Sequence, residues 1–302
     1  LTVVETLKKI KEIAPKTELI DTIFIMNKRK QLVGTVKLRD ILIADENEKI
    51  AQITNGNFIY VEPETDQEEV ALLASKYDLN VIPVLNKRKV MLGIITIEDI
   101  VDVMVEEQTE DVLQMGGVDK EEKLDSTVWQ SVKMRFPWLF INLITAFLAA
   151  MTVKAFESTI AKVVALSSIM SIVTGMGGNA GTQTVSIIIR NIAMGKIKLK
   201  DTWKLLLKEF LLGLINGAGI GLITGVVVYF IYGNFYLGLI IFLAMIGNLI
   251  IAGVTGLLIP LLLHKLHFDP ALSSSIFLTT ATDVLGFFFF LSLAKLFLPL
   301  LV

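Results

Sequence analysis

Hydrophobic residues follow two different patterns along the chain. In the first third, short apolar runs alternate with charged turns, whereas long apolar stretches with few charges follow after residue 136. Each of these stretches reaches the roughly 20 residues that a membrane-spanning helix needs. We therefore predict five spanning helices, over residues 136–156, 163–189, 206–232, 236–263 and 271–298.

The first third contains an internal repeat. Residues 23–42 read IFIMNKRKQLVGTVKLRDIL and residues 82–101 read IPVLNKRKVMLGIITIEDIV. Each copy predicts a strand, a charged hairpin turn, a second strand and a helix that opens near an aspartate. A further helix is predicted over Gln67–Tyr77, because Thr65 and Asp66 precede it as opening residues.

Composition separates the two parts further. Hydrophobic residues make up 53% of the chain and the mean hydropathy is +0.66, which is typical of membrane proteins. Residues 137–302 hold ten basic and five acidic side chains, which leaves 18 and 25 of the totals of 28 and 30 for the front part. An acidic front part without a basic stripe argues against a nucleic-acid partner. The chain has no cysteine and two histidines, so a bound metal would be held by oxygen atoms.

An acidic segment joins the two parts. Residues 99–114 predict a helix with one apolar face, which Gly116 and Gly117 end. Its carboxylates recur at spacings of three and four, so like charges lie next to one another and repel. Two interpretations stay open, an ordinary solvated face or a sensor in which divalent cations relieve the repulsion. The acids are Asp99, Asp102, Glu106, Glu107, Glu110 and Asp111.

The distribution of basic residues predicts the orientation. The loop between the third and fourth stretches has no charge, whereas the connection after the second is strongly basic. The positive-inside rule then places the front part in the cytoplasm of a multi-pass plasma-membrane protein, and no signal peptide precedes that part. The basic residues of this connection are Arg190, Lys196, Lys198, Lys200, Lys204 and Lys208.

Asp283 is the most unusual residue of the apolar part. It lies in the otherwise uncharged run 270–294, where an ionised carboxylate costs roughly 2.5–3.5 kcal/mol on insertion scales. Residues 174–184, TGMGGNAGTQT, are also unusual for a spanning helix. They indicate either an opened backbone that lines a cavity or a small-residue packing interface. Asp283 follows Thr279 by four residues, so both lie on one helix face. Together with residues 174–184, this face favours a cation pore.

Other polar positions have a local explanation. Asp269 followed by Pro270 is typical of a helix start, and Asp269 could also bind a cation at the pore mouth. Asn216, Asn248 and the series Gly213, Gly217 and Gly221 indicate helix packing.

The front part resembles a pair of CBS domains over about residues 1–105. Such pairs often bind adenosine nucleotides through a threonine and an aspartate three residues apart, which here are Thr96 and Asp99. The first copy has Lys37 in place of the threonine, so at most one nucleotide site is expected. The alternative is that Asp40 and Asp99 only cap helices.

With GGNAGTQ in the second apolar stretch and DPA…TTATD in the fifth, the whole chain resembles the MgtE family of magnesium channels or transporters. The resemblance implies an α+β CBS-domain pair (1–105), an acidic plug and connecting helix (106–135) and an all-α domain of five transmembrane helices (136–302). Family members form homodimers with the pore between the subunits. They commonly carry an acidic helical domain ahead of the CBS pair, which this sequence lacks.

The resemblance also implies three groups of Mg²⁺ sites. Asp283, Asn179 and Thr279 match the pore positions. Asp269, Glu107, Glu110 and Asp111 match the cytoplasmic mouth and the plug. Glu68, Asp78, Asp99 and Asp102 match sensor positions in the second CBS unit.

The implied function is import of Mg²⁺, shut off when cytosolic Mg²⁺ binds the CBS domains and the plug. Two alternatives from other classes stay open: an ion-coupled secondary transporter of another divalent cation, and a nucleotide-sensing membrane scaffold. An enzyme is not expected, because a lone intramembrane carboxylate provides no acid–base pair.

Overall fold

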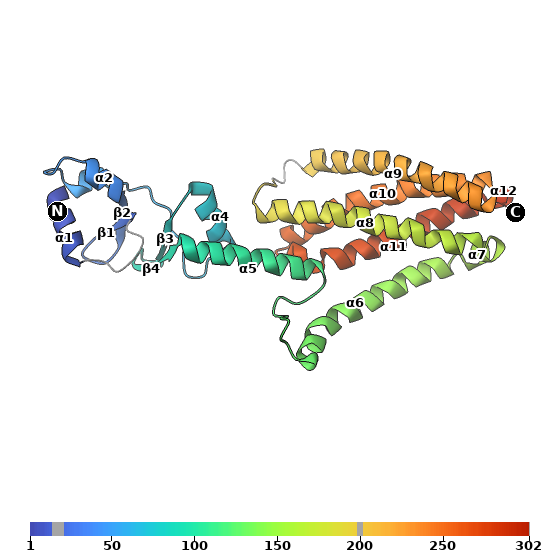
Figure 1. The fold of residues 1–302 in the computed structure, drawn as a ribbon, viewed down its shortest axis with the longest axis horizontal. Helices are drawn as coiled ribbons and strands as arrows, with labels where there is room; N and C mark the ends of the chain where they lie inside the picture. Colours follow the sequence, from blue (N-terminus) through green and yellow to red (C-terminus); the bar gives the residue numbers. More distant parts are fainter. Residues whose placement is uncertain (14–20, 198–201, 302) are drawn as a thin grey trace. The chain divides into compact units, whose positions relative to one another are not determined.

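The computed structural model describes residues 1–13, 21–197 and 202–301 (Figure 1). The chain forms two compact units, Leu1–Glu107 and Gln108–Val302, which are described separately. Lys198 and Lys200, counted above in the basic connection, lie outside the described residues.

The first unit contains two antiparallel hairpins, one in each copy of the repeat. The predicted order of strand, turn, strand and helix is confirmed in both copies. The two ladders match position for position, because Ile25 pairs with Gly34 and Val84 pairs with Gly93, and each has a bulge at the next pair. The elements are α1 (Val3–Ile13), β1 (Thr22–Met26), β2 (Leu32–Lys37), α2 (Leu38–Ile43), α3 (Ile50–Ile53), α4 (Gln67–Tyr77), β3 (Val81–Leu85), β4 (Met91–Thr96) and α5 (Ile97–Met115), which continues into the second unit.

The predicted helix over 67–77 is confirmed as α4, including its start. The Asp66 carboxylate accepts a hydrogen bond from the Glu68 backbone N–H at 2.9 Å, which satisfies one of the unpaired amides of the first turn. At the other end Asp78 adopts a left-handed conformation with φ of 51°. The predicted acidic helix is also confirmed, since α5 ends at Met115 and Gly117 follows with φ of +71°.

Each copy of the repeat has its own small core. In the first copy Val3, Val36, Ile41 and Ile50 pack together, and in the second Val70, Ala74, Ile82 and Ile100 are among the buried residues.

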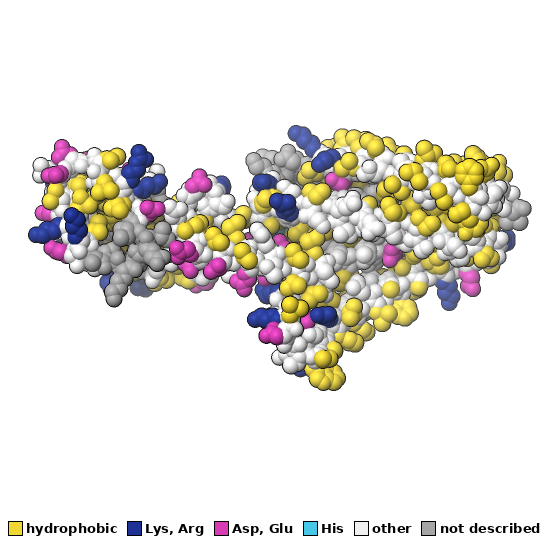
Figure 2. Space-filling model, in the orientation of Figure 1, with side chains coloured by type: hydrophobic (Ala, Val, Ile, Leu, Met, Phe, Trp, Pro, Cys, Tyr) yellow, Lys and Arg dark blue, Asp and Glu magenta, His cyan; other side chains and the backbone are white. Residues whose placement is uncertain are grey.

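All regular secondary structure of the second unit is helical over its described residues. Its elements are α6 (Val128–Lys154), α7 (Glu157–Lys162), α8 (Ala165–Ala193), α9 (Thr202–Tyr232), α10 (Phe235–Lys265), α11 (Pro270–Leu296) and α12 (Leu298–Leu301), after the end of α5. The short helices α7 and α12 were not predicted. Figure 2 shows hydrophobic side chains over α9, with basic side chains gathered near its start.

Four helices of the described residues are long and apolar enough to cross a membrane: α6, α9, α10 and the 274–296 part of α11. The 29-residue helix α8, which contains the predicted second span, is not among them. Its glycines, threonines and asparagine lower its hydropathy. The chain is therefore a multi-pass membrane protein.

Helix α10 is the most buried of these four helices. Its apolar window is 56% buried, compared with 6% for α6. The central cluster of the unit includes Ile240, Ala244 and Met245 from α10 together with Leu166 from α8 and Phe290 from α11, all almost fully buried.

The packing prediction for the glycine series of α9 is confirmed. A Cβ atom at Gly213 would lie 2.6 Å from the Ile250 Cα, and one at Gly217 would lie 2.6 Å from the Ile246 Cα. The series continues to Gly225, which faces Gly238. Small residues at every fourth position let the backbones of α9 and α10 touch.

The backbone of residues 174–184 is helical throughout, so the opened-backbone interpretation is wrong. The packing alternative explains the buried glycines. A Cβ atom at Gly181 would lie 2.5 Å from Leu278 Cδ1 of α11, and one at Gly177 would collide with the Asn248 amide of α10. The glycines are needed because neighbouring helices approach closely, and the helical hydrogen bonds stay intact.

Candidate functional site

Asp283 lies in the middle of α11 and is half-buried. Among the described residues its carboxylate forms no ion pair and no hydrogen bond. A carboxylate held by a lysine or arginine would have a structural explanation. Asp283 has none, so its position favours a cation or water as its partner.

The second feature is a polar face on α8. Gly175, Asn179, Thr182 and Gln183 are all exposed, and their spacing of four, three and one places them on one side of the helix. The opposite side, with Val173, is buried. An amide and a hydroxyl gain nothing from contact with lipid tails. This face therefore needs water or another protein surface.

The contacts of α8 and α11 place these two features at similar depth. Gly181 packs against Leu278, while Gly177 and Gly286 both pack against the Asn248 amide. Moving along α8 from Gly177 to Gly181 therefore corresponds to moving back along α11 from Gly286 towards Leu278, so the two helices are antiparallel. Asn179 and Asp283 both lie within the segments of α8 and α11 that these contacts bracket. Thr279, also exposed, lies at the level of Gly181.

Asn248 holds this part of the unit together. It is fully buried, and its Nδ2 donates to the Val173 carbonyl at 2.5 Å. Its amide fills the space left by Gly177 of α8 and Gly286 of α11. The packing prediction for Asn248 is thereby confirmed. Its Oδ1 has no partner among the described residues, so burying this amide carries a desolvation cost.

A second carboxylate, Glu209 in α9, was not predicted as a site residue. It is 9% exposed, and its Oε2 accepts a hydrogen bond from Thr184 Oγ1 of α8 at 2.9 Å. The description of Asp283 as a lone intramembrane carboxylate is therefore wrong. A signal was present, because Glu209 precedes Gly213 by four residues and so begins the same buried face of α9.

Asp269 is exposed and caps α11, as predicted. Its Oδ1 accepts from the Ala271 backbone N–H at 2.8 Å, and Pro270 occupies the first turn. The last residue of α5, Met115, packs against Ala271 and Leu278 of α11 and against Val185 of α8. The end of the acidic helix therefore lies at the end of the helix pair that carries Asp283.

The acids of α5 differ in their surroundings. Glu110 is already paired, with Lys120 Nζ at 3.2 Å and Gln114 Nε2 at 2.6 Å. Glu107 accepts from Gln67 Nε2 at 2.5 Å. Part of the predicted like-charge repulsion is thus relieved by local partners.

In the second CBS copy, Thr96 and Asp99 form a reciprocal cap at the start of α5. Asp99 Oδ2 accepts from Thr96 Oγ1 at 2.7 Å and from the Thr96 backbone N–H at 2.9 Å. The Thr96 hydroxyl and then its backbone amide lower the pKa of the Asp99 carboxyl. Asp40 in the first copy makes no such bond, because Lys37 stands at the cap position, so the capping expectation was wrong for Asp40.

The predicted sensor residues lie on α4, at its C-terminal end and on α5. Asp78 and Asp102 are exposed, and Glu68 lies in the first turn of α4. Among the described residues, no group of three or more Asp, Glu, His or Cys side chains is arranged to hold a metal. A pocket of about 170 Å³ includes Val70, Ile100 and Thr65, but neither Thr96 nor Asp99 lines it.

Comparison with known proteins supplies the family. A family model described as a divalent cation transporter, MgtE, matches residues 170–293, and a CBS domain model matches residues 50–106. The magnesium transporter MgtE of Bacillus subtilis is 32% identical over 98% of this chain and 66% of its own length. That of Thermus thermophilus is 34% identical over 99% of this chain and 66% of its own length. The chain belongs to the MgtE family.

A solved cytosolic domain of the Mg²⁺ channel MgtE, in complex with ATP, is 39% identical, covers 34% of this chain and 42% of the other, and has a TM-score of 0.33. The chain spans about two thirds of the length of the MgtE proteins it matches. The MgtE family model covers Asn179, Asp269, Thr279 and Asp283, and the CBS model covers Glu68, Asp78, Asp99 and Asp102. Glu107, Glu110 and Asp111 of α5 lie outside both matched ranges.

Proposed function

We propose that two copies of this chain form a channel or transporter that imports Mg²⁺ and closes when cytosolic Mg²⁺ is high. The observation that carries this proposal is the exposed polar face of α8, a helix that packs on α11, which holds the half-buried Asp283. The names of the relatives, magnesium transporters, support the choice of ion.

The polar face supports a homodimer. Asn179, Thr182 and Gln183 are exposed on a single protomer within a helix long enough to span the bilayer, since 29 residues extend about 44 Å. A second copy that packs its own α8 and α11 against this face would enclose a polar path. α8 is then the fifth spanning helix. The basic sequence between α8 and α9 supports a cytoplasmic location for the CBS domains under the positive-inside rule.

The oxygen atoms on this path suit a hydrated hard cation. Mg²⁺ gives up its water reluctantly, so the Asp283 carboxylate, the Asn179 amide and the Thr279 carbonyl would bind it through its hydration shell. Entry is driven by the membrane potential, which supplies about 4.6 kcal/mol for a divalent ion per 100 mV.

The end of α5 supports gating at the cytoplasmic mouth. Met115 packs beside the first turn of α11, which Asp269 caps. Mg²⁺ bound between Asp269 and the plug acids Glu107, Glu110 and Asp111 would hold this helix in place. Further ions at Glu68, Asp78, Asp99 and Asp102 would favour the same closed arrangement. Adenosine nucleotide bound at Thr96 and Asp99 would couple cellular energy status to this switch.

Glu209 favours a second candidate, a transporter coupled to protons. Carboxylates within membrane-spanning helices commonly mark proton pathways, and Glu209 is buried in α9 with the Thr184 hydroxyl as its partner. Flux that collapses without a proton gradient, and that becomes independent of it in Glu209→Gln, would support this candidate over a channel.

The test of the main proposal is Mg²⁺ influx into liposomes that contain the full chain. Asp283→Asn keeps the size of the side chain and removes its charge, and we expect influx to fall about a hundredfold, in line with the roughly 3 kcal/mol value of an intramembrane charge. Asp125→Asn, an exposed position of the linker, is the matched control. Normal influx through Asp283→Asn would overturn the proposal.

Gating has a separate test. With Glu107, Glu110 and Asp111 changed to their amides, we expect influx to continue at Mg²⁺ concentrations that close the parent protein. The control removes the charges of Glu12 and Glu46, two exposed acids that precede the second copy of the repeat. Closure at the same Mg²⁺ concentration in the triple variant would refute the role of the plug acids.

A further inference from the structure

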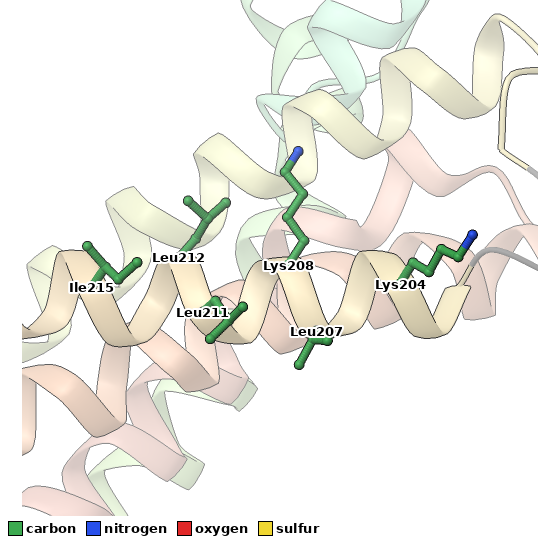
Figure 3. A pocket seen from close by; sticks show the side chains of 6 residues that line it. All are labelled: Lys204, Leu207, Lys208, Leu211, Leu212 and Ile215. Atoms are coloured by element: carbon green, nitrogen blue, oxygen red, sulfur yellow. The ribbon is translucent and has the colours of Figure 1, made fainter.

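An open groove of about 360 Å³ runs along the outer surface of α9 (Figure 3). Two lysines lie at one end, and four apolar side chains form the rest of its lining. Lys208, Leu212 and Ile215 project from the same side of the helix in this view. The lining consists of Lys204, Leu207, Lys208, Leu211, Leu212 and Ile215.

The order of these residues along the helix matches the two ends of a phospholipid. Lys204 and Lys208 lie one turn apart, and Leu211, Leu212 and Ile215 continue on the same side deeper into the apolar part of α9. From residue 204 to residue 215 the helix rises about 16 Å. One leaflet of a bilayer has a hydrocarbon layer of about 15 Å, half of the full core. The groove therefore extends from the headgroup level to about the centre of the membrane.

The positive charge of this groove is not neutralised by the described part of the protein. Neither Lys204 nor Lys208 forms an ion pair with a described carboxylate. The neighbouring Glu209 faces the opposite way, since it is buried and accepts from Thr184. Trp203, 74% exposed, adds an aromatic ring at the headgroup level, where such rings are favoured.

A second groove in the same unit provides a comparison. It lies at the start of α6, has a volume of about 410 Å³ and is lined by Val132, Phe136 and Leu139 together with Arg135. Arg135 is already paired with Glu122, its Nη2 lying 2.9 Å from the Glu122 Oε1. The two grooves are both apolar and basic, but only the one on α9 offers unneutralised charge to an anion.

The occupant of the α9 groove is more consistent with lipid than with a second copy. The exposed side of α9 is mainly apolar, with Leu211, Ile215, Leu222 and Phe230 beside one polar side chain, Asn216. The exposed residues of α8 include Asn179, Thr182 and Gln183, for which contact with lipid tails is unfavourable. The polar face accounts for contact between copies, and the apolar face remains for the membrane.

We propose that this groove binds one anionic phospholipid, with the headgroup phosphate between Lys204 and Lys208 and an acyl chain along Leu211, Leu212 and Ile215. The inference depends on the protein spanning a membrane and not on the ion that it transports. Each lysine near an anionic lipid surface raises affinity about fivefold, so removal of both lowers it roughly 25-fold.

The experiment compares lipid retention by the full chain. Protein in detergent receives phosphatidylglycerol or phosphatidylcholine of identical acyl chains, and native mass spectrometry counts the lipids that stay bound. We expect the parent chain to retain one phosphatidylglycerol in preference to phosphatidylcholine, and Lys204→Gln with Lys208→Gln to lose this preference. The control variant, Lys154→Gln with Lys295→Gln, removes two exposed lysines elsewhere in the unit. We expect it to keep the preference for phosphatidylglycerol.

A third variant tests the acyl chain separately. Leu211→Trp fills the groove while both lysines remain, so we expect phosphatidylglycerol retention to fall as well. Circular dichroism and gel filtration establish that each variant is folded. Retention unchanged in both groove variants would overturn the proposal. Loss of preference in the lysine variant alone, with inorganic phosphate competing as well as lipid, would show a simple anion site and also overturn it.

The rival occupant, a second copy, has its own readout. The parent chain has no cysteine, so Leu211→Cys introduces a single thiol. Disulfide formation between copies in a bilayer would place this face in a protein interface and overturn the lipid assignment. We expect no such crosslink, and we expect a fluorophore attached to this thiol to be quenched by a nitroxide on a lipid acyl chain. Loss of Mg²⁺ influx in Asp283→Asn with intact lipid retention would separate this inference from the proposed function.

Discussion

The two copies of the CBS repeat share a backbone but differ in what they do with it. Both hairpins have the same register, the same bulge position and a lysine in the left-handed conformation, Lys30 with φ of 60° and Lys89 with φ of 59°. The helices that follow differ greatly, since α2 has 6 residues and α5 has 19. Only the helix of the second copy therefore continues along the chain into the second unit.

Two equivalent positions explain much of the difference. Gly34 is buried, and a Cβ atom there would lie 2.7 Å from the Asn55 carbonyl oxygen, whereas Gly93 has open space around it. Thr96 caps α5 through Asp99, whereas Lys37 leaves α2 without a side-chain cap. A shared sequence pattern thus specifies the backbone, while the role of a residue depends on what packs against it.

The largest effect is expected at the two glycines. Gly34→Ala pushes a methyl group into the Asn55 backbone, which pairs with Thr35 through two hydrogen bonds of 3.0 and 2.9 Å and cannot easily move. We expect a loss of about 1–3 kcal/mol of stability, typical of overpacking. Thermal unfolding followed by circular dichroism measures it in the full chain.

The equivalent substitution in the second copy is the control. Gly93→Ala meets no atom within 4 Å, and alanine fits a strand better than glycine, so stability should stay the same or rise by up to about 1 kcal/mol. Equal effects at both positions would mean that the two copies pack alike, contrary to the structure.

The hairpins and long helices could be predicted because their signals are local. The NKRK turns, the alternating strands and the apolar stretches of 20 residues or more act through neighbouring residues, and the structure confirms the elements they predict. The short helices α7 and α12 were missed because each has only a few residues and no periodic pattern to detect.

The site was predicted in part, and the misses have physical causes. Asp283 stands out in sequence because a charge in an apolar run is costly. Glu209 stands out less, because Lys204 and Lys208 precede it and make the start of the apolar stretch look polar. Its burial depends on the packing of α9 on α10, which a local pattern indicates only weakly. The prediction of an opened backbone in α8 failed because the space that the glycines provide is filled by Asn248 and Leu278, which lie far away in sequence.

A smaller effect is expected at the caps. Thr96→Ala removes both the hydroxyl donor to Asp99 and the capping oxygen, and we expect α5 to lose about 1 kcal/mol. Lys37→Thr is the reverse experiment, because Lys37 already has the extended backbone of a cap residue, with φ of −74° and ψ of 141°, and Asp40 lies three residues later. Amide hydrogen exchange in the first turns of α2 and α5 measures both. Faster exchange in α2 of Lys37→Thr would contradict the prediction.

The next smaller effect is expected at the acidic residues of α5. Each pair of like charges one turn apart costs about 0.2–0.5 kcal/mol. Glu106→Gln removes repulsion with Asp102 and with Glu110, and we expect a slightly more stable helix without divalent ions and a smaller gain on adding Mg²⁺. Glu46→Gln in the first copy should leave the Mg²⁺ response of the melting temperature unchanged. The same Mg²⁺ response in both variants would exclude a metal effect on this helix.

The smallest effect concerns pH. Hydrogen bonds from Thr96 lower the pKa of Asp99 in the folded protein, so its ionised form is stabilised above the unfolded pKa of about 3.9. That stabilisation is lost as pH falls through the lower, folded pKa. Asp99→Asn should therefore flatten the decline in stability below about pH 4.

Asp40→Asn, which removes a carboxylate without a capping bond, should leave the decline as it is. Because Asp99 is exposed, the difference will be small, and a titration of the α5 amide signals by NMR detects it better than global unfolding. A decline that both variants flatten equally would show that the cap contributes nothing specific to the second copy.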